Sequence, residues 1–195
     1  MNLSHAKSSY KKAKLLIRKT QPSILVLQEL SNGWEKALEK TLMRFAYSVK
    51  FSENTMDGIG FPLPNFLIPK EKLFIGFFSH LPFEKFTTDQ SGDLSTSYIR
   101  GSFKFKEKVF TLFGVDLVSP VGKYRTDLRN KQLASLAEEV QKNNQPTMVG
   151  GDFNITPWPS YFEEFIQKTR LRDTRKRVRC LSDLASPVSY TIYPY

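Results

Sequence analysis

Cysteine and histidine are scarce in this sequence of 195 residues, which contains one cysteine, Cys180, and two histidines. A single cysteine excludes an intrachain disulfide framework and any metal cluster built from several cysteines, and it is compatible with a reducing compartment. Long apolar runs are also missing, so neither a signal peptide nor a bilayer-spanning helix is indicated. We therefore expect a soluble protein of the cytoplasm.

The rest of the composition is typical of a folded domain. Hydrophobic residues make up 40% of the chain and aromatic residues 13%, which argues against disorder. The length suits one domain with a sizeable core. Because no repeat, low-complexity tract or linker interrupts the sequence, we expect a single domain over residues 1–195.

Positive charge is in excess, with 29 basic and 19 acidic residues and a formal net charge of +10. Such an excess favours attraction to polyanions such as nucleic acid or an anionic membrane surface. Much of it lies between residues 168 and 179, and the four basic residues that we take as candidate phosphate contacts there are Arg172, Arg175, Lys176 and Arg177. A solvated basic face explains so short a run equally well.

Apolar periodicity and turn signals predict a chain in which helices and strands alternate. Helices are predicted over residues 6–21, 33–45, 126–144 and 159–170. Isolated strands are predicted over residues 23–30 and 146–152, and an antiparallel series of strands over residues 72–88 and 96–120. The glycines and prolines between residues 52 and 70 indicate a long loop.

Two of the predicted strands end in acidic residues. Glu29 lies at the end of one strand, and Asp152 follows two glycines at the end of the other; a predicted helix precedes each strand. We expect both strands in the same region of one sheet, so that both carboxylates emerge where sites are commonly built. Mg²⁺ needs oxygen ligands, and it often uses one or two carboxylates together with water and substrate phosphate.

The pair Asp152 and Asn154 places an acceptor for a water proton beside a donor for a phosphate oxygen. The two preceding glycines allow close backbone approach or unusual torsions. However, Gly-Asp-x-Asn is also a good turn sequence, and Glu29 could equally be a capping or loop carboxylate. On spacing alone the functional and the structural interpretation both stand.

Two motifs together carry a resemblance that neither carries by itself. "LVLQEL" at residues 25–30, followed by "VGGDFNITPWPS" at residues 149–160, resembles the endonuclease/exonuclease/phosphatase family of metal-dependent phosphoesterases. The resemblance extends over most of the chain and includes "LRDT" at residues 171–174. It implies an α/β fold, a four-layer α/β/β/α sandwich of two mixed sheets with helices outside.

The resemblance also implies roles for individual residues. Glu29 is expected to ligate Mg²⁺ or Mn²⁺, Asp152 to orient or deprotonate the attacking water, and Asn154 to hydrogen-bond a phosphate oxygen. Asn2 matches the family's metal-proximal asparagine more weakly, because only Met1 precedes it where a strand is usual. The implied substrate is a phosphate ester, and nucleic acid is one candidate among the sugar-phosphate and lipid esters that the family cleaves.

Two departures from the family pattern leave a second hypothesis open. The sequence has no Ser-Asp-His tripeptide, and Asp116 stands where many members carry a histidine. Asp116 is therefore either a substituted site residue or an ordinary polar residue at a strand end. We expect the chain to be short at both ends, without the family's closing strands. The two hypotheses are a metal-dependent phosphoesterase and a catalytically silent member that binds polyanions through residues 168–179.

Overall fold

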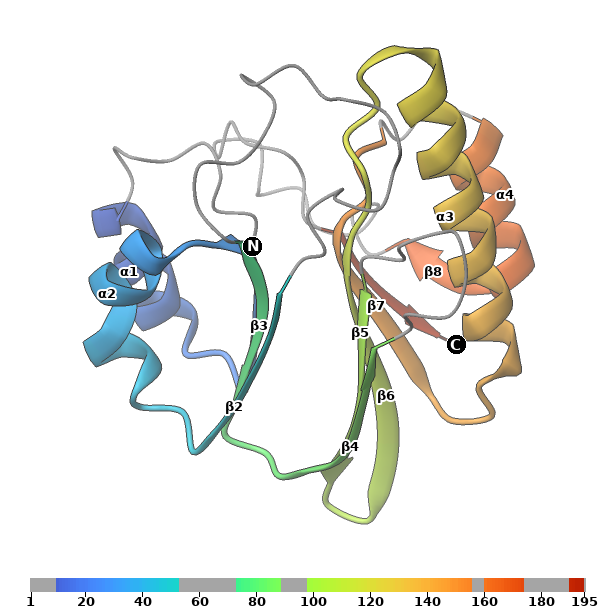
Figure 1. The fold of residues 1–195 in the computed structure, drawn as a ribbon. Helices are drawn as coiled ribbons and strands as arrows, with labels where there is room; N and C mark the ends of the chain where they lie inside the picture. Colours follow the sequence, from blue (N-terminus) through green and yellow to red (C-terminus); the bar gives the residue numbers. More distant parts are fainter. Residues whose placement is uncertain (1–9, 53–72, 89–97, 156–159, 174–189, 195) are drawn as a thin grey trace. The chain divides into compact units, whose positions relative to one another are not determined.

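The structure is a computed structural model that describes residues 10–52, 73–88, 98–155, 160–173 and 190–194 (Figure 1). The chain divides into two compact units, a first unit of residues 1–82 and a second unit of residues 83–195. No helix in the described ranges is both long enough and apolar enough to cross a membrane.

The first unit combines two helices with a small antiparallel sheet. Its elements are α1 (Tyr10–Thr20), β1 (Ile24–Leu30), α2 (Asn32–Leu42), β2 (Tyr47–Ser52) and β3 (Phe74–Ser79). The strand order is β1-β3-β2, so β3 pairs with both neighbours. The core of the unit contains buried residues of both helices and of β1 and β3, including Ala13, Leu27, Leu38 and Phe78.

Local sequence explains where α2 begins and which side it buries. Ser31 is its N-cap, and the Ser31 hydroxyl accepts a hydrogen bond from the Trp34 backbone N–H at 3.4 Å. Trp34, Leu38 and Leu42 recur every four residues and are buried. The helix thus begins at Asn32, one residue before the predicted start at Gly33.

The second unit contains a mixed six-stranded sheet. Its strands are β4 (Phe83–Thr88), β5 (Tyr98–Phe105), β6 (Lys108–Asp116), β7 (Thr147–Asp152), β8 (Leu171–Asp173) and β9 (Tyr190–Pro194), in the order β4-β5-β6-β7-β9-β8. Only β6 and β7 are parallel, and the other pairs are antiparallel. A parallel pair needs a crossover connection, which α3 (Gly122–Lys142) provides.

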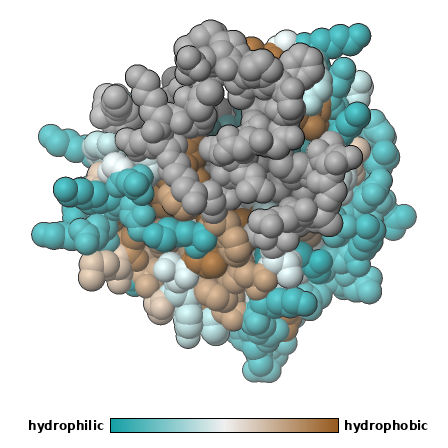
Figure 2. Space-filling model, viewed as in Figure 1, coloured by the Kyte–Doolittle hydropathy of each residue, from teal (hydrophilic) through white to brown (hydrophobic). Residues whose placement is uncertain are grey.

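Helices α3 and α4 (Ser160–Thr169) lie side by side against the six-stranded sheet (Figure 1). Leu133, Leu136 and Val140 of α3 share a core with Val149 of β7 and Phe165 of α4. The opposite side of α3 is exposed and polar, and hydrophilic residues cover this side of the second unit in Figure 2. This burial confirms the apolar face that leucine spacing predicted for the helix.

The strand predictions need three corrections. Residues 72–88 do not continue one antiparallel series, because β3 pairs within the first unit and β4 within the second. The strand β2 was not predicted, since residues 47–52 have no clear apolar run. Finally, β1 and β7 lie in different sheets rather than in one. The reason is that strand partners are chosen by tertiary packing, which a strand's own pattern does not reveal.

Candidate active site

Two buried carboxylates lie at the ends of the parallel strands β6 and β7. Asp116 and Asp152 are register partners in this pair, and their exposed fractions are 8% and 6%. Parallel strands end at the same edge of a sheet, so both residues lie at one edge of the second unit (Figure 1). Buried ionisable groups at such an edge are typical of functional sites, although structural networks also bury them.

A tight turn fixes the position of Asp152. The backbone N–H of Asn154 donates to Asp152 Oδ1 at 2.8 Å, the local turn that aspartate side chains favour. Asn154 itself has a φ of 46°, and Gly151 has a φ of 154°. Asparagine tolerates the left-handed region better than most residues, and glycine tolerates a positive φ freely. The predicted unusual torsions beside Asp152 are confirmed.

The loop after β6 joins the turn after β7 through two hydrogen bonds. Asn154 Nδ2 donates to the carbonyl oxygen of Leu117 at 2.6 Å. The backbone N–H of Leu117 donates to the carbonyl oxygen of Asp152 at 2.9 Å. Asn154 therefore holds the neighbouring loop with one of its two amide hydrogens, and the second hydrogen can be donated to a ligand.

Helix α3 braces both loops with polar side chains from its buried face. Arg129 Nη1 donates to the carbonyl oxygen of Asn154 at 2.6 Å, and Gln132 Oε1 accepts from the Val118 backbone N–H at 2.9 Å. Both side chains are buried, with exposed fractions of 6% and 1%. Burial lowers the pKa of the Arg129 guanidinium below its ordinary value, while Tyr161 acts in the opposite direction.

Arg129 and Gln132 were not predicted from the sequence. Their signal was present, because they lie three residues apart and flank the leucines of the apolar stripe of α3. Polar residues on the buried side of a helix need hydrogen-bond partners. Here the partners are backbone groups of loops that only the fold brings to the helix.

Glu29 lies at a β-bulge in the first unit. Between Leu27 and Leu30 the register with β3 shifts, so that three steps along β1 match two steps along β3. Glu29 is half-buried and has a φ of 52°. A bulge changes the direction in which a side chain leaves the sheet, and it often does so next to functional sites.

Backbone strain coincides with the predicted site residues. Five described residues other than glycine have a positive φ, namely Gln21, Glu29, Lys106, Asn154 and Arg170. Gln21 and Arg170 directly follow helices, and Lys106 lies in the turn between β5 and β6, where such torsions are ordinary. The other two are Glu29 and Asn154. A bulge holds the first of these torsions and a tight turn the second, and such strain at the end of a strand motivates a hypothesis of function.

The structure brings together three of the predicted site residues and leaves the others apart or outside the described ranges. Asp116, Asp152 and Asn154 meet at one edge of the second unit, while Glu29 belongs to the first. Arg172 is half-buried on β8. Asn2, Arg175, Lys176 and Arg177 lie outside the described residues. Across the described ranges, no group of three or more histidine, cysteine, aspartate or glutamate side chains is placed to hold a metal ion.

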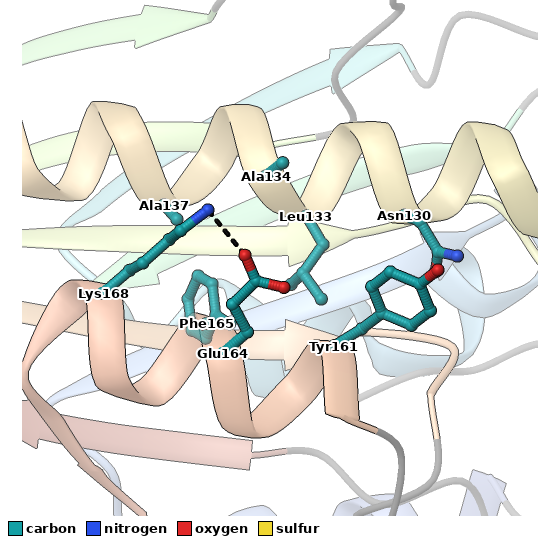
Figure 3. Close-up of a pocket in the computed structure, with 8 residues that line it drawn as sticks. All are labelled: Asn130, Leu133, Ala134, Ala137, Tyr161, Glu164, Phe165 and Lys168. Carbon is teal, nitrogen blue, oxygen red and sulfur yellow. Dashed lines mark ion pairs between the residues drawn. The ribbon is translucent and has the colours of Figure 1, made fainter.

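A surface pocket between α3 and α4 has a different character (Figure 3). Leu133, Ala137 and Phe165 supply its apolar lining, and Lys168 forms an ion pair with Glu164 at 2.7 Å beside them. The hydrogen bond from Lys168 to Glu164 raises the pKa of Lys168. With its cation already paired, this pocket offers little to an anionic substrate.

Comparisons with known proteins agree with this architecture. A sequence model of the endonuclease/exonuclease/phosphatase family matches residues 2–190. The catalytic domain of human nocturnin, solved with a sulfate anion, is 19% identical, with a TM-score of 0.66 over 96% of this chain and 75% of that one. No curated protein sequence matches significantly.

Two further solved structures have the same fold at lower identity. Beta toxin from Staphylococcus aureus with bound magnesium ions is 14% identical, with a TM-score of 0.61 over 86% of this chain and 65% of that one. TDP2 from D. rerio with a single-strand DNA product is 13% identical, with a TM-score of 0.62 over 99% of this chain and 81% of that one. The α/β fold with two sheets and helices, expected from the sequence, is confirmed.

Proposed function

The chain belongs to the endonuclease/exonuclease/phosphatase family, and we propose that it hydrolyses phosphate esters with the help of Mg²⁺ or Mn²⁺. One observation carries the proposal. Asp152 lies buried at the end of β7, beside Asp116 of the parallel neighbour, and its carboxylate is fixed by the Asn154 backbone N–H at 2.8 Å. A carboxylate held in this way is prepared to accept a proton without first reorganising.

The proposed reaction is attack of water on phosphorus. Asp152 orients the water and accepts its proton while the new P–O bond forms. The P–O bond to the leaving alcohol breaks, and the alkoxide takes a proton from solvent. Asn154 donates its second amide hydrogen to an oxygen of the phosphate, where negative charge develops in the transition state. The hydrogen bond to Leu117 keeps this amide in place.

Glu29 is the residue that we assign to the divalent ion. Its carboxylate oxygens are ligands that suit Mg²⁺. This ion commonly takes one or two carboxylates and fills its remaining positions with water and substrate. Glu29 is half-buried on a bulged strand end. A divalent ion supplies positive charge that can neutralise a phosphate ester to which it binds. Beta toxin, which has the same fold, was solved with magnesium ions.

Nucleic acid is the substrate class that we favour. The net charge of +10 favours a polyanion, and the TDP2 structure of the same fold contains a DNA product. Fold alone does not select the ester, since one scaffold can serve many reactions. The second hypothesis, a silent member that binds polyanions through residues 168–179, depends on the same excess of charge.

Hydrolysis of bis(p-nitrophenyl) phosphate and of plasmid DNA, with Mg²⁺, with Mn²⁺ and with chelator, tests the proposal. We expect metal-dependent turnover that Asp152→Asn reduces by about 10²- to 10⁴-fold, the usual effect of removing a general base. The matched control is Asp127→Asn, the same change at an exposed position on α3. Absence of metal-dependent turnover by folded protein, with salt-sensitive DNA binding retained, would establish the silent polyanion binder instead.

A further inference from the structure

The buried face of α3 changes in character along the helix. Its carboxyl-terminal half presents apolar residues such as Leu136 and Val140 to the sheet. Its amino-terminal half presents Gln132 and Arg129 to the loops after β6 and β7. Arg125, four residues before Arg129, lies on the same side of the helix one turn further on.

The direction of α3 places this basic end at the carboxylate edge. Because α3 connects the parallel strands β6 and β7, it runs opposite to both, and its amino-terminal end lies beside the strand ends that carry Asp116 and Asp152 (Figure 1). Arg129 is level with the turn after β7, since it contacts the carbonyl oxygen of Asn154. Four residues of helix are about 6 Å long, so Arg125 lies one turn nearer to the amino-terminal end of α3 than Arg129 does.

Arg125 and Arg129 differ in what they contact. Arg129 donates to the carbonyl oxygen of Asn154 and to Asn130 Oδ1. Arg125 is half-buried, and its Nε is shielded from solvent without a hydrogen-bond partner in the part of the chain that the structure describes. Burial lowers the pKa of the Arg125 guanidinium below its ordinary value. A buried guanidinium nitrogen without a hydrogen-bond partner is costly in the free protein, and an anion would satisfy it.

We propose that Arg125 is a substrate-binding residue that donates to an anionic oxygen of the phosphate ester held at the Asp116–Asp152 edge. This inference rests on the proposed function, which identifies the bound anion as a phosphate ester. Arg129 then holds the site together, and Arg125 binds what enters it. The planar guanidinium suits two phosphate oxygens at once.

Binding of inorganic phosphate, measured by calorimetry on the full chain, tests this role without requiring turnover. We expect Arg125→Gln to weaken phosphate binding about tenfold, the usual effect of losing a hydrogen bond to a charged group. Arg125→Lys keeps the charge and should recover part of the affinity. The matched control is Lys123→Gln, which removes an exposed cation two residues away and should change the affinity less than twofold.

Kinetics and thermal melting separate binding from a structural role. For bis(p-nitrophenyl) phosphate we expect Arg125→Gln to raise KM about tenfold with kcat almost unchanged, the signature of lost uniform binding. The melting temperature should stay the same or rise, because a desolvated cation is removed. Three results would each overturn the assignment. The first is equal phosphate affinity in wild type and Arg125→Gln, and the second is an equal loss of affinity in Arg125→Gln and Lys123→Gln. The third is a lower melting temperature of Arg125→Gln. If wild type binds phosphate through Arg125 yet hydrolyses nothing, the binding role stands and the proposed function fails.

Discussion

The ends of β1 and β7 each present a predicted site residue on strained backbone, but the two are held differently. Glu29 owes its left-handed φ to a bulge opposite β3. Asn154 is held by the Asp152 carboxylate, the Leu117 carbonyl oxygen and the Arg129 guanidinium. The backbone at Glu29 therefore depends on strand pairing. The backbone at Asn154 depends on hydrogen bonds with the end of β7, the loop after β6 and helix α3.

This difference indicates where each site is sensitive to mutation. At the β7 end the side chain of Asn154 contributes to folding and is also assigned to catalysis, so its loss should harm both. At the β1 end the bulge is made by backbone pairing with β3. A residue with a side chain, such as Glu29, adopts the positive φ of this bulge at a cost in conformational energy. Glycine accepts a positive φ. Substitution by glycine should therefore lower the free energy of unfolding at the β7 end more than at the β1 end.

The largest expected changes in stability follow from substitution of Asn154, and Asn154→Gly isolates the contribution of its side chain. Glycine accepts the φ of 46° but removes the donor to the Leu117 carbonyl oxygen, so we expect a loss of about 1–2 kcal/mol in the free energy of unfolding. Urea denaturation measures this loss, and hydrolysis should fall as well. Asn154→Ala, which adds torsional strain, should lose more than Asn154→Gly. A glycine variant as stable as wild type would show that the side chain does not hold the loop.

A smaller change is expected from Arg129→Met, which keeps the apolar stem and removes the guanidinium. The carbonyl oxygen of Asn154 loses its donor, but a desolvated charge disappears too, so we expect a net loss of about 1 kcal/mol in the free energy of unfolding. Because the turn that holds Asp152 loosens, kcat should fall more than KM rises. Arg129→Lys is the control that retains one donor. An unchanged kcat in Arg129→Met would show that Arg129 does not support the catalytic geometry of Asp152.

The smallest change in stability is expected from Glu29→Gly. Relief of the positive φ should offset the lost side-chain contacts, leaving the free energy of unfolding within about 0.5 kcal/mol of wild type or higher. Metal-dependent hydrolysis should nevertheless be lost, and Mg²⁺ binding measured by calorimetry should weaken. Glu29→Gln keeps the size and the strain, so it should lose metal binding without gaining stability. A glycine variant as destabilised as Asn154→Gly would contradict the contrast between the two strand ends.

Much of the local structure could be predicted from the sequence, because it depends on neighbours along the chain. The leucine spacing predicted the buried face of α3, and the glycines before Asp152 predicted its unusual backbone. The assignment of β3 and β4 to different sheets could not be predicted, since both are short aromatic strands separated by one turn. Nor could Arg129 and Gln132 be recognised, because their partners lie on loops remote in the sequence.

The sequence by itself determined the family, the strand ends that carry Glu29 and Asp152, and the excess of positive charge. These are properties of residue type, short motifs and local periodicity. Only the tertiary structure decided that Asp116 is the register partner of Asp152, that Asn154 joins two loops, and that the amino-terminal end of α3 lies beside the ends of β6 and β7. The physical reason is that buried polar groups must find hydrogen-bond partners, and which partners they find depends on how distant segments pack.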